Sequence, residues 1–177
     1  DSEFDAIFSC KEGCFLGEAE GKDNKEIDVT KCRQLSGNVR EYYEKLGQTF
    51  VDALNDMLVL DAIIMNTDRH FGNFGFIVDN KTNKIVAPAP LFDHGNALLN
   101  FAGRDDLESE KALNEYASTL VPCVYDDFIG TAKKVLTNEH REGLRKLLEF
   151  KFKKNSRYNL PDKRLKMLEK MIQTRAK

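Results

Sequence analysis

The fold of this chain is decided by the stretch NTDRHFGN at residues 66–73. This stretch places two carboxamides, an acid, an arginine and a histidine directly after a long apolar segment. Asn66 and Thr67 favour local hydrogen bonds to the backbone over a place inside a helix, so a helix is expected to end there. The sequence therefore predicts a polar loop that begins at the end of a buried helix.

The apolar segment before the loop carries a helical pattern from residue 38 to residue 65. Ser36 or Asn38 can cap its start. Gly47 is expected to divide it into helices at 39–46 and 48–65, because glycine is unfavourable inside a helix. Toward its end the second helix is apolar on nearly all sides, which is typical of a buried helix.

Two short β-prone runs follow the loop, FGFIV at 74–78 and KIVAP at 84–88. The connection between them, DNKTN, is rich in turn residues, so the pair is expected to form a β-hairpin that ends at the following prolines. A hairpin returns the chain close to its starting point. The next motif, DHG at 93–95, is therefore expected to lie beside the polar loop.

Helical patterns cover much of the remaining sequence. Helices are expected around 108–116, at 125–136, after a cap at Thr137 or Asn138, and in a last segment whose first turn holds Pro161. Together the patterns predict a mainly α protein with a small β-hairpin, an α+β fold.

The bulk composition is that of an ordinary globular protein. The chain has 177 residues, 41% of them apolar and 32% charged, which suits one domain. No run approaches 18 apolar residues, so no membrane span is expected, and no signal-peptide pattern is visible. The cysteines lack the paired spacing of a zinc site and are expected to be reduced thiols of a cytoplasmic protein. They are Cys10, Cys14, Cys32 and Cys123.

The net charge of −2 conceals a strong asymmetry along the chain. Residues 133–177 carry 15 Lys and Arg against 5 Asp and Glu. These basic residues alternate with leucines at helical spacing, which is the pattern of a helix face exposed to solvent. Direct binding of nucleic acid is therefore not expected.

The polar loop and the DHG motif together supply the groups that phosphoryl transfer needs. Asp68 and Asn73 are five residues apart in the loop, and Asp93 follows the hairpin. A carboxamide oxygen and a carboxylate are hard ligands that suit Mg²⁺, which also binds the phosphates of a substrate. The other acid is then left to orient or deprotonate a hydroxyl group.

The order of these motifs resembles the catalytic segment of kinases, in which a D-x-x-x-x-N loop precedes a hairpin and a D-x-G motif. Here Arg69 and His70 follow the aspartate, and DRHFGN resembles the catalytic loop of phosphatidylinositol 3/4-kinases. The longer NTDRHFGNFG resembles the N-x-D-x-H-x-x-N-F-G segment of HipA-like bacterial serine/threonine kinases, and this is the preferred match. The motifs cover about residues 60–97.

The resemblance implies a role for each matching residue. Asp68 would be the catalytic aspartate, and Asn73 and Asp93 would hold Mg²⁺ and the nucleotide. His70 would lie near the phosphates of ATP or brace the loop. Arg69 would pair with a phosphate or with a neighbouring acid.

The resemblance also implies that residues 1–177 form a single domain equivalent to the C-terminal lobe of a kinase. A kinase needs a loop that covers the phosphates, a strand lysine and a partner glutamate. No such set is found before residue 60, and the acidic segment at 1–37 does not match a nucleotide-binding loop. The N-terminal lobe is therefore expected to be absent from this chain, which would be poorly active alone.

The expected function is ATP- and Mg²⁺-dependent transfer of a phosphoryl group to a Ser or Thr hydroxyl of a protein. HipA-like kinases are often toxin components with a DNA-binding partner, so the resemblance implies an antitoxin-like regulatory partner. A lipid kinase of the phosphatidylinositol type is the alternative within the class. A non-catalytic pseudokinase that binds partners through its basic C-terminal helices is the alternative outside it. A metal-dependent phosphohydrolase would need more His and Asp ligands.

Overall fold

The computed structural model describes residues 36–177, with side chains from residue 39 onward. The expectations for the acidic N-terminal segment, including three of the four cysteines, lie outside the described residues. The described chain is mostly helical with a two-stranded antiparallel sheet, so the predicted mainly α fold with a β-hairpin is confirmed. Its elements are α2 (Ser36–Leu46), α3 (Gln48–Ile64), η2 (Phe71–Asn73), β1 (Phe76–Asp79), β2 (Lys84–Pro88), η3 (Asp105–Leu107), α4 (Glu110–Thr119), α5 (Phe128–Val135), α6 (Asn138–Leu147) and α7 (Asp162–Arg175).

Gly47 separates α2 from α3, as the sequence predicts. Its φ of 113° lies in a region that residues with a Cβ atom rarely adopt, and it forms the N-cap of α3. The Gly47 amide donates to the carbonyls of Tyr43 and Glu44, which closes α2. The chain can therefore turn sharply and pack α2 back against α3.

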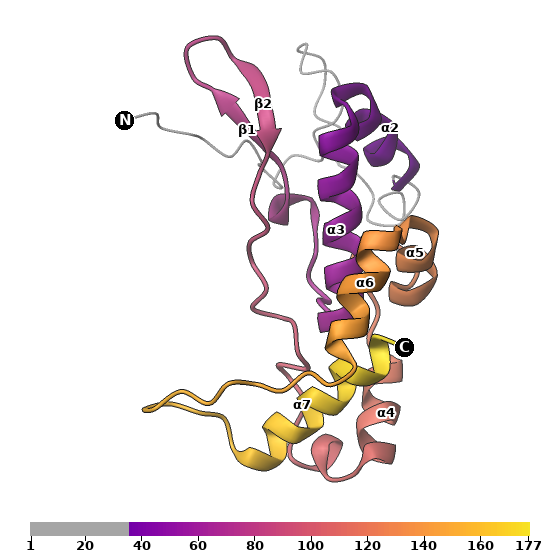
Figure 1. The fold of residues 1–177 in the computed structure, drawn as a ribbon, viewed down its shortest axis with the longest axis vertical. Helices are drawn as coiled ribbons and strands as arrows, with labels where there is room; N and C mark the ends of the chain where they lie inside the picture. The colour runs from indigo at the N-terminus through magenta and orange to yellow at the C-terminus, as the bar shows by residue number, and fades with distance from the viewer. Residues whose placement is uncertain (1–35) are drawn as a thin grey trace.

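Helix α3 is the long central helix (Figure 1). It contributes residues to both hydrophobic clusters of the described chain. Its first half packs against α2, the loop after η2 and the start of β1. The buried members of this first cluster are Val39, Tyr43, Val51, Leu54, Met57, Phe74 and Phe76. One helix therefore holds the hairpin at one end and the C-terminal helices at the other.

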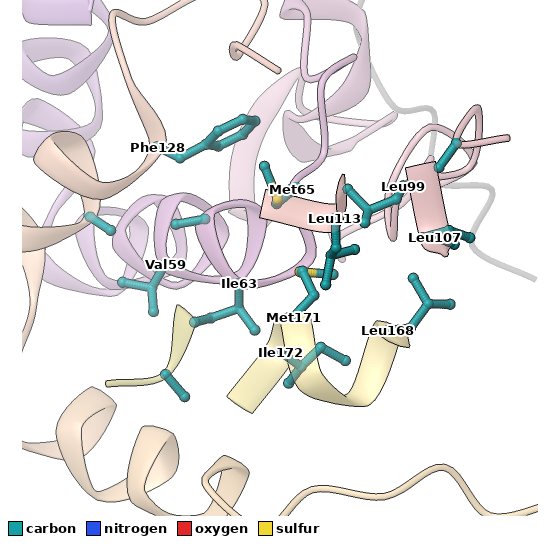
Figure 2. Packing of buried hydrophobic residues seen from close by; sticks show 14 of the residues in the cluster. Val59, Ile63, Met65, Leu99, Leu107, Leu113, Phe128, Leu168, Met171 and Ile172 are labelled. Atoms are coloured by element: carbon teal, nitrogen blue, oxygen red, sulfur yellow. The ribbon is translucent and has the colours of Figure 1, made fainter. Parts of the chain in front are cut away.

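The second cluster surrounds the end of α3 and joins it to the C-terminal half of the chain (Figure 2). Val59 and Ile63 of α3, with its C-cap residue Met65, meet residues from the loop after the hairpin and from η3, α4, α5 and α7. Those partners include Leu99, Leu107, Leu113, Phe128, Leu168, Met171 and Ile172. Segments that are far apart in sequence thus share one core beneath the end of α3.

The hairpin is short and irregular. Phe76 pairs with Pro88 and Asp79 with Lys84, and the register shifts after Ile77 so that a β-bulge interrupts the ladder. The Asp79 carboxylate accepts hydrogen bonds from the amides of Lys81 and Thr82, which builds the turn. The hairpin then delivers the following segment back to the side of α3 (Figure 1).

The segment at 89–104 runs beside α3 from the hairpin toward α4 and is held along its length (Figure 1). The Leu98 amide donates to the carbonyl of Ile64 at 2.6 Å, which occupies an acceptor at the end of α3. Arg164 of α7 donates to three carbonyls of the segment, those of Leu99, Asn100 and Ala102. Contacts from the end of α3 and from α7 therefore fix the path of this segment.

Side-chain caps determine where the helices α5 and α6 begin. Thr137 caps α6 as predicted, with its hydroxyl accepting from the amide of His140. The helix predicted at 125–136 begins only at Phe128, because the carboxylate of Asp127 accepts from the Gly130 amide and caps it there. Pro161 precedes α7 as its N-cap residue instead of occupying the first turn.

The basic C-terminal helices expose most of their surface. Helix α6 has no buried residue, and α7 buries Leu168, Met171 and Ile172 on one face. The lysines of both helices are exposed, as expected of solvated helix faces, but Arg164 and Arg175 are partly buried and donate to backbone carbonyls of other segments. Within the part of the chain that the structure describes, none of the helices combines the length and the apolar character that crossing a membrane requires.

Truncating Leu168 tests the second cluster. Leu168 is 2% exposed, and Leu168→Ala is expected to lower the free energy of unfolding by about 2–5 kcal/mol, because it removes buried carbons and leaves a cavity. Leu160→Ala is the matched control, since Leu160 is 49% exposed and should change stability by less than about 0.5 kcal/mol. Urea unfolding measures both, and equal effects would contradict the packing described.

Candidate catalytic site

A buried ion pair between α3 and the polar loop organises the site. Asp61 and Arg69 are both fully buried. The guanidinium donates from Nε to Asp61 Oδ2 at 2.8 Å and from a terminal nitrogen to Oδ1 at 2.9 Å. This two-bond arrangement matches the fork of arginine to both oxygens of a carboxylate and fixes the orientation of each group.

The remaining terminal nitrogen of Arg69 joins the loop to the segment that follows the hairpin. It donates to the carbonyl of Asn73 at 2.6 Å and to the carbonyl of Phe92 at 2.7 Å. The oxygen atoms of these two carbonyls are therefore separated by no more than the sum of the two hydrogen-bond distances. Because Phe92 precedes Asp93, one side chain brings the backbones of both predicted metal ligands to the same place.

Asn66 completes the end of α3 and forms a second connection. Met65 adopts a left-handed conformation with φ 53°, and the Asn66 amide donates to the Asp61 carbonyl. The fully buried Asn66 side chain donates to Asp61 Oδ1 at 3.3 Å and to the Asp93 carbonyl at 3.5 Å. Its Oδ1 accepts from the Asp68 amide at 3.2 Å. Asn66 is thus more than a helix cap, because it contacts both halves of the site.

Asp68 is partly buried, and its carboxylate is held on one side. Its Oδ2 accepts from the amide of Asn96 at 2.8 Å. Its carbonyl accepts from the side chain of Asn73 at 2.7 Å and from the His70 amide at 2.9 Å. The Asp68 backbone and side chain therefore contact both the loop and the segment beyond Asp93.

Asn73 and Asp93 have the oxygen atoms that a divalent cation needs. Asn73 is 3% exposed, and because its Nδ2 donates to the Asp68 carbonyl, its Oδ1 is directed away from that bond. Asp93 is exposed and adopts a left-handed conformation with φ 55°. Two hard oxygen donors fit Mg²⁺, which keeps several waters or phosphate oxygens in its shell.

Acidic and metal-binding side chains do not otherwise gather in the described part of the chain. Over residues 36–177 no group of three or more His, Cys, Asp and Glu residues is placed to hold a metal ion. This pattern differs from a zinc or calcium cage built from protein ligands alone. A cation at Asn73 and Asp93 would depend on a phosphorylated substrate for the rest of its ligands.

The two histidines of the motifs are placed differently. His70 caps the short helix η2, and its Nδ1 accepts from the Gly72 amide at 3.1 Å. It therefore braces the loop, and a contact with phosphate stays a prediction. His94 is partly buried, and its Nε2 is enclosed with no hydrogen-bond partner among the described residues.

Sequence reasoning missed two residues of this site. Asp61 lies inside the helix that reads as apolar, and a single acid within LVLDAIIM is the pattern that could have identified it. Asn96 follows the DHG motif directly, but nothing in its spacing indicates a contact with Asp68. For Arg69, the structure selects the neighbouring acid over a phosphate as its partner.

A cavity of about 370 Å³ lies between α2, α3 and α5. Phe71 and Phe74, on either side of Asn73, line it together with Met57 and Tyr125. Asp68, Asn73 and Asp93 do not line it, so it is distinct from the predicted nucleotide site.

Tyr125 lies near the buried ion pair, and the folded protein raises the pKa of its hydroxyl group. Burial, together with the charge of Asp61, raises the pKa of Tyr125 far above its ordinary value of 10.0. Its hydroxyl is buried with no hydrogen-bond partner among the described residues. Arg175 is nearby, and burial lowers the pKa of its guanidinium. Both side chains add polar atoms to the interior beneath the loop.

Comparison with known proteins supports the fold. No protein-family model matches the sequence, and no curated protein sequence matches it. A crystal structure of the Helicobacter pylori proinflammatory kinase CtkA is similar, with a TM-score of 0.52 and 19% sequence identity. The match covers 98% of this chain and 66% of that one, so this chain spans about two thirds of the length of that structure. At this identity the similarity shows a kinase-like α+β fold and no more.

Removing the guanidinium of Arg69 tests how much the buried ion pair with Asp61 contributes to stability. Arg69→Met is expected to lower the free energy of unfolding by about 3–5 kcal/mol, because it leaves the Asp61 carboxylate buried without a cationic partner. Adding Asp61→Leu should restore part of this loss, since no isolated charge then remains.

Lys111→Met is the control for the Arg69 experiment. It removes an ion pair with Glu115 in which the side chains are 86% and 68% exposed, and the expected change is below about 1 kcal/mol. Denaturant unfolding measures all the variants. A loss for Arg69→Met no greater than that of the control would contradict the buried pair.

Tyr125→Phe tests whether the raised pKa of the Tyr125 hydroxyl makes stability depend on pH. Because the folded protein raises the pKa of Tyr125 above 10.0, the folded state holds this proton more tightly than the unfolded state. The resulting stability is complete below pH 10 and is lost as pH rises further. The variant should match the wild type near pH 7 within about 1 kcal/mol and should lose less stability above pH 10. Unfolding curves with identical alkaline slopes would contradict this placement.

Proposed function

We propose that this chain is the catalytic lobe of an ATP- and Mg²⁺-dependent kinase of the HipA-like type, which transfers the γ-phosphoryl group to a Ser or Thr hydroxyl of a protein. The observation that supports this most is the convergence of two motifs on one place. Arg69 joins the carbonyls of Asn73 and Phe92, and Asn66 and Asn96 add two further bonds between the same segments.

This convergence favours catalysis over a scaffold role. Four polar side chains cross-link the loop to the DHG segment: Arg69, Asn66, Thr67 and Asn96. A pseudokinase that only binds partners has no need for an acid, a carboxamide and a second acid held together in this way. An enzyme does need them, because catalysis depends on groups that are in position before the substrate arrives.

Asp68 is the group for the acceptor hydroxyl. One of its oxygens is occupied by the Asn96 amide, so the other can accept a hydrogen bond from a hydroxyl group. As the hydroxyl oxygen bonds to the γ-phosphorus, the bond from that phosphorus to the β-phosphate oxygen breaks, and the hydroxyl proton passes to the Asp68 carboxylate. The products are a phosphorylated acceptor and ADP.

Asn73 and Asp93 are the groups for the metal. The Asn73 Oδ1 and the Asp93 carboxylate would hold Mg²⁺, which when bound neutralises the charge of the phosphates. His70 holds the backbone turn that presents Asn73, through its bond to the Gly72 amide. All three nitrogens of the Arg69 guanidinium are hydrogen-bonded inside the protein and the side chain is fully buried, so we assign it no contact with the nucleotide.

The proposals of a protein as phosphoryl acceptor and of a regulatory partner rest on the sequence resemblance. The extended NTDRHFGNFG match favours a protein acceptor, and DRHFGN alone also fits a phosphatidylinositol kinase. The kinase named in the similar crystal structure adds support for phosphoryl transfer in general. We keep an antitoxin-like regulatory partner as part of the proposal, since HipA-like kinases commonly have one.

Asp93→Asn in the full-length gene product tests the proposed function. The wild type is expected to transfer label from γ-³²P-ATP to protein in the presence of Mg²⁺. The variant should lose more than about 100-fold of the rate, because one of two protein ligands of the metal loses its charge. Asp126→Asn is the control, since Asp126 is an exposed acid without an assigned role, and it should remain active.

The choice of acceptor separates the alternatives. Labelling of protein Ser or Thr residues would support the proposal, and labelling only of phosphatidylinositol vesicles would replace it with a lipid kinase. A wild-type gene product that labels neither acceptor, and does not consume ATP, would leave the pseudokinase alternative in its place.

A further inference from the structure

The position of Asn96 is unusual for a residue outside the kinase motifs. It lies three residues after Asp93, yet its side-chain Nδ2 donates to Asp68 Oδ2 at 2.8 Å. Its carbonyl accepts from the Thr67 hydroxyl at 3.4 Å. Asn96 therefore touches two consecutive residues of the polar loop, which lie 29 and 28 residues before it in the sequence.

The backbone around Asn96 is fixed on both sides. Before it, the Asp93 carbonyl accepts from the Asn66 side chain. After it, the Ala97 amide donates to the His94 carbonyl at 3.1 Å, and the Leu98 amide donates to the Ile64 carbonyl at 2.6 Å. The backbone that carries the Asn96 side chain is thus held by hydrogen bonds on both sides, independently of the Asp68 side chain.

The contact with Asn96 fixes the orientation of the Asp68 carboxylate. A carboxylate on a partly exposed side chain can rotate, and each orientation offers a different oxygen to the solvent. Anchoring Oδ2 leaves Oδ1 as the oxygen that a hydroxyl group can reach. An amide is a neutral donor, so the contact orients the carboxylate without pairing it with a cation. Among the described residues, no lysine or arginine is hydrogen-bonded to this carboxylate.

We propose that Asn96 is a positioning residue for phosphoryl transfer, which holds the Asp68 carboxylate so that its second oxygen receives the proton of the acceptor hydroxyl. The contact also links the orientation of this acid to the segment that carries Asp93. The proton acceptor and one metal ligand are then placed by the same rigid segment. This inference rests on the proposed function and assigns a role within it to a residue outside the recognised motifs.

Asn96→Leu in the full-length gene product tests the inference, because leucine has a similar size and no donor. We expect kcat to fall by about 10- to 100-fold, as is found when a group that orients a catalytic ligand is removed. The KM for ATP should stay within about twofold, since Asn96 touches neither predicted metal ligand side chain. Asn100→Leu is the matched control: it makes the same change at an exposed position of the same segment and should leave kcat unchanged.

A double-mutant cycle separates positioning from a general structural effect. If Asn96 acts through Asp68 alone, Asn96→Leu should cause no further loss of kcat in an Asp68→Ala background. The thermal unfolding midpoint of each variant shows whether the fold is kept. Asn96→Ala, which also lacks the N–H donors and adds no charge, replaces the leucine variant if that protein does not fold, and it should show the same split between kcat and KM.

The outcomes distinguish this inference from the proposed function. If the wild type transfers phosphate and Asn96→Leu keeps its full kcat, the inference is overturned and the proposed function stands. A loss that appears in the KM for ATP, or that is undiminished in the Asp68→Ala background, also overturns it. A wild type without any transfer overturns the proposed function and this inference with it.

Discussion

The buried pair of Asp61 and Arg69 is the interaction on which the rest of the site depends. Removing two charges from water is costly, and the cost is offset only when every donor and acceptor finds a partner. Each nitrogen of the Arg69 guanidinium has a hydrogen-bond partner, and these partners lie on α3, in the loop and in the segment after the hairpin. The requirement to satisfy one buried cation therefore brings together three segments that are separate in sequence.

The backbone around the site is also unusual. Met65, Asp93, Leu98 and Leu99 all adopt φ values of 53–55°, which residues other than glycine rarely do. Such conformations cost free energy and persist where the surroundings determine them. Here the surroundings are the end of α3, the Asn66 side chain and the carbonyls held by Arg164. The strained residues thus lie where the site must be held in one arrangement.

The two hydrophobic clusters along α3 give this arrangement a rigid base. The first cluster holds the start of the hairpin through Phe74 and Phe76, and the second holds the loop after it through Leu99. Both ends of the segment that carries Asp93 are therefore fixed to the same helix. A kinase-like lobe needs this property, because its catalytic groups come from different segments and must keep their relative positions.

The sequence by itself determined the elements and the chemical inventory. The glycine break before α3, the hairpin turn, the cap of α6 and the apolar α3 follow from local preferences, so they could be predicted, and the spacing of Asp68, Asn73 and Asp93 indicated the chemistry. Tertiary structure alone decided the partner of Arg69, the bridging role of Asn66 and the contact of Asn96 with Asp68. Most of these contacts join residues that are far apart along the chain, and the local sequence favours none of the possible hydrogen-bond partners over the others. Only the packing of α3 against the segment after the hairpin selects the partner.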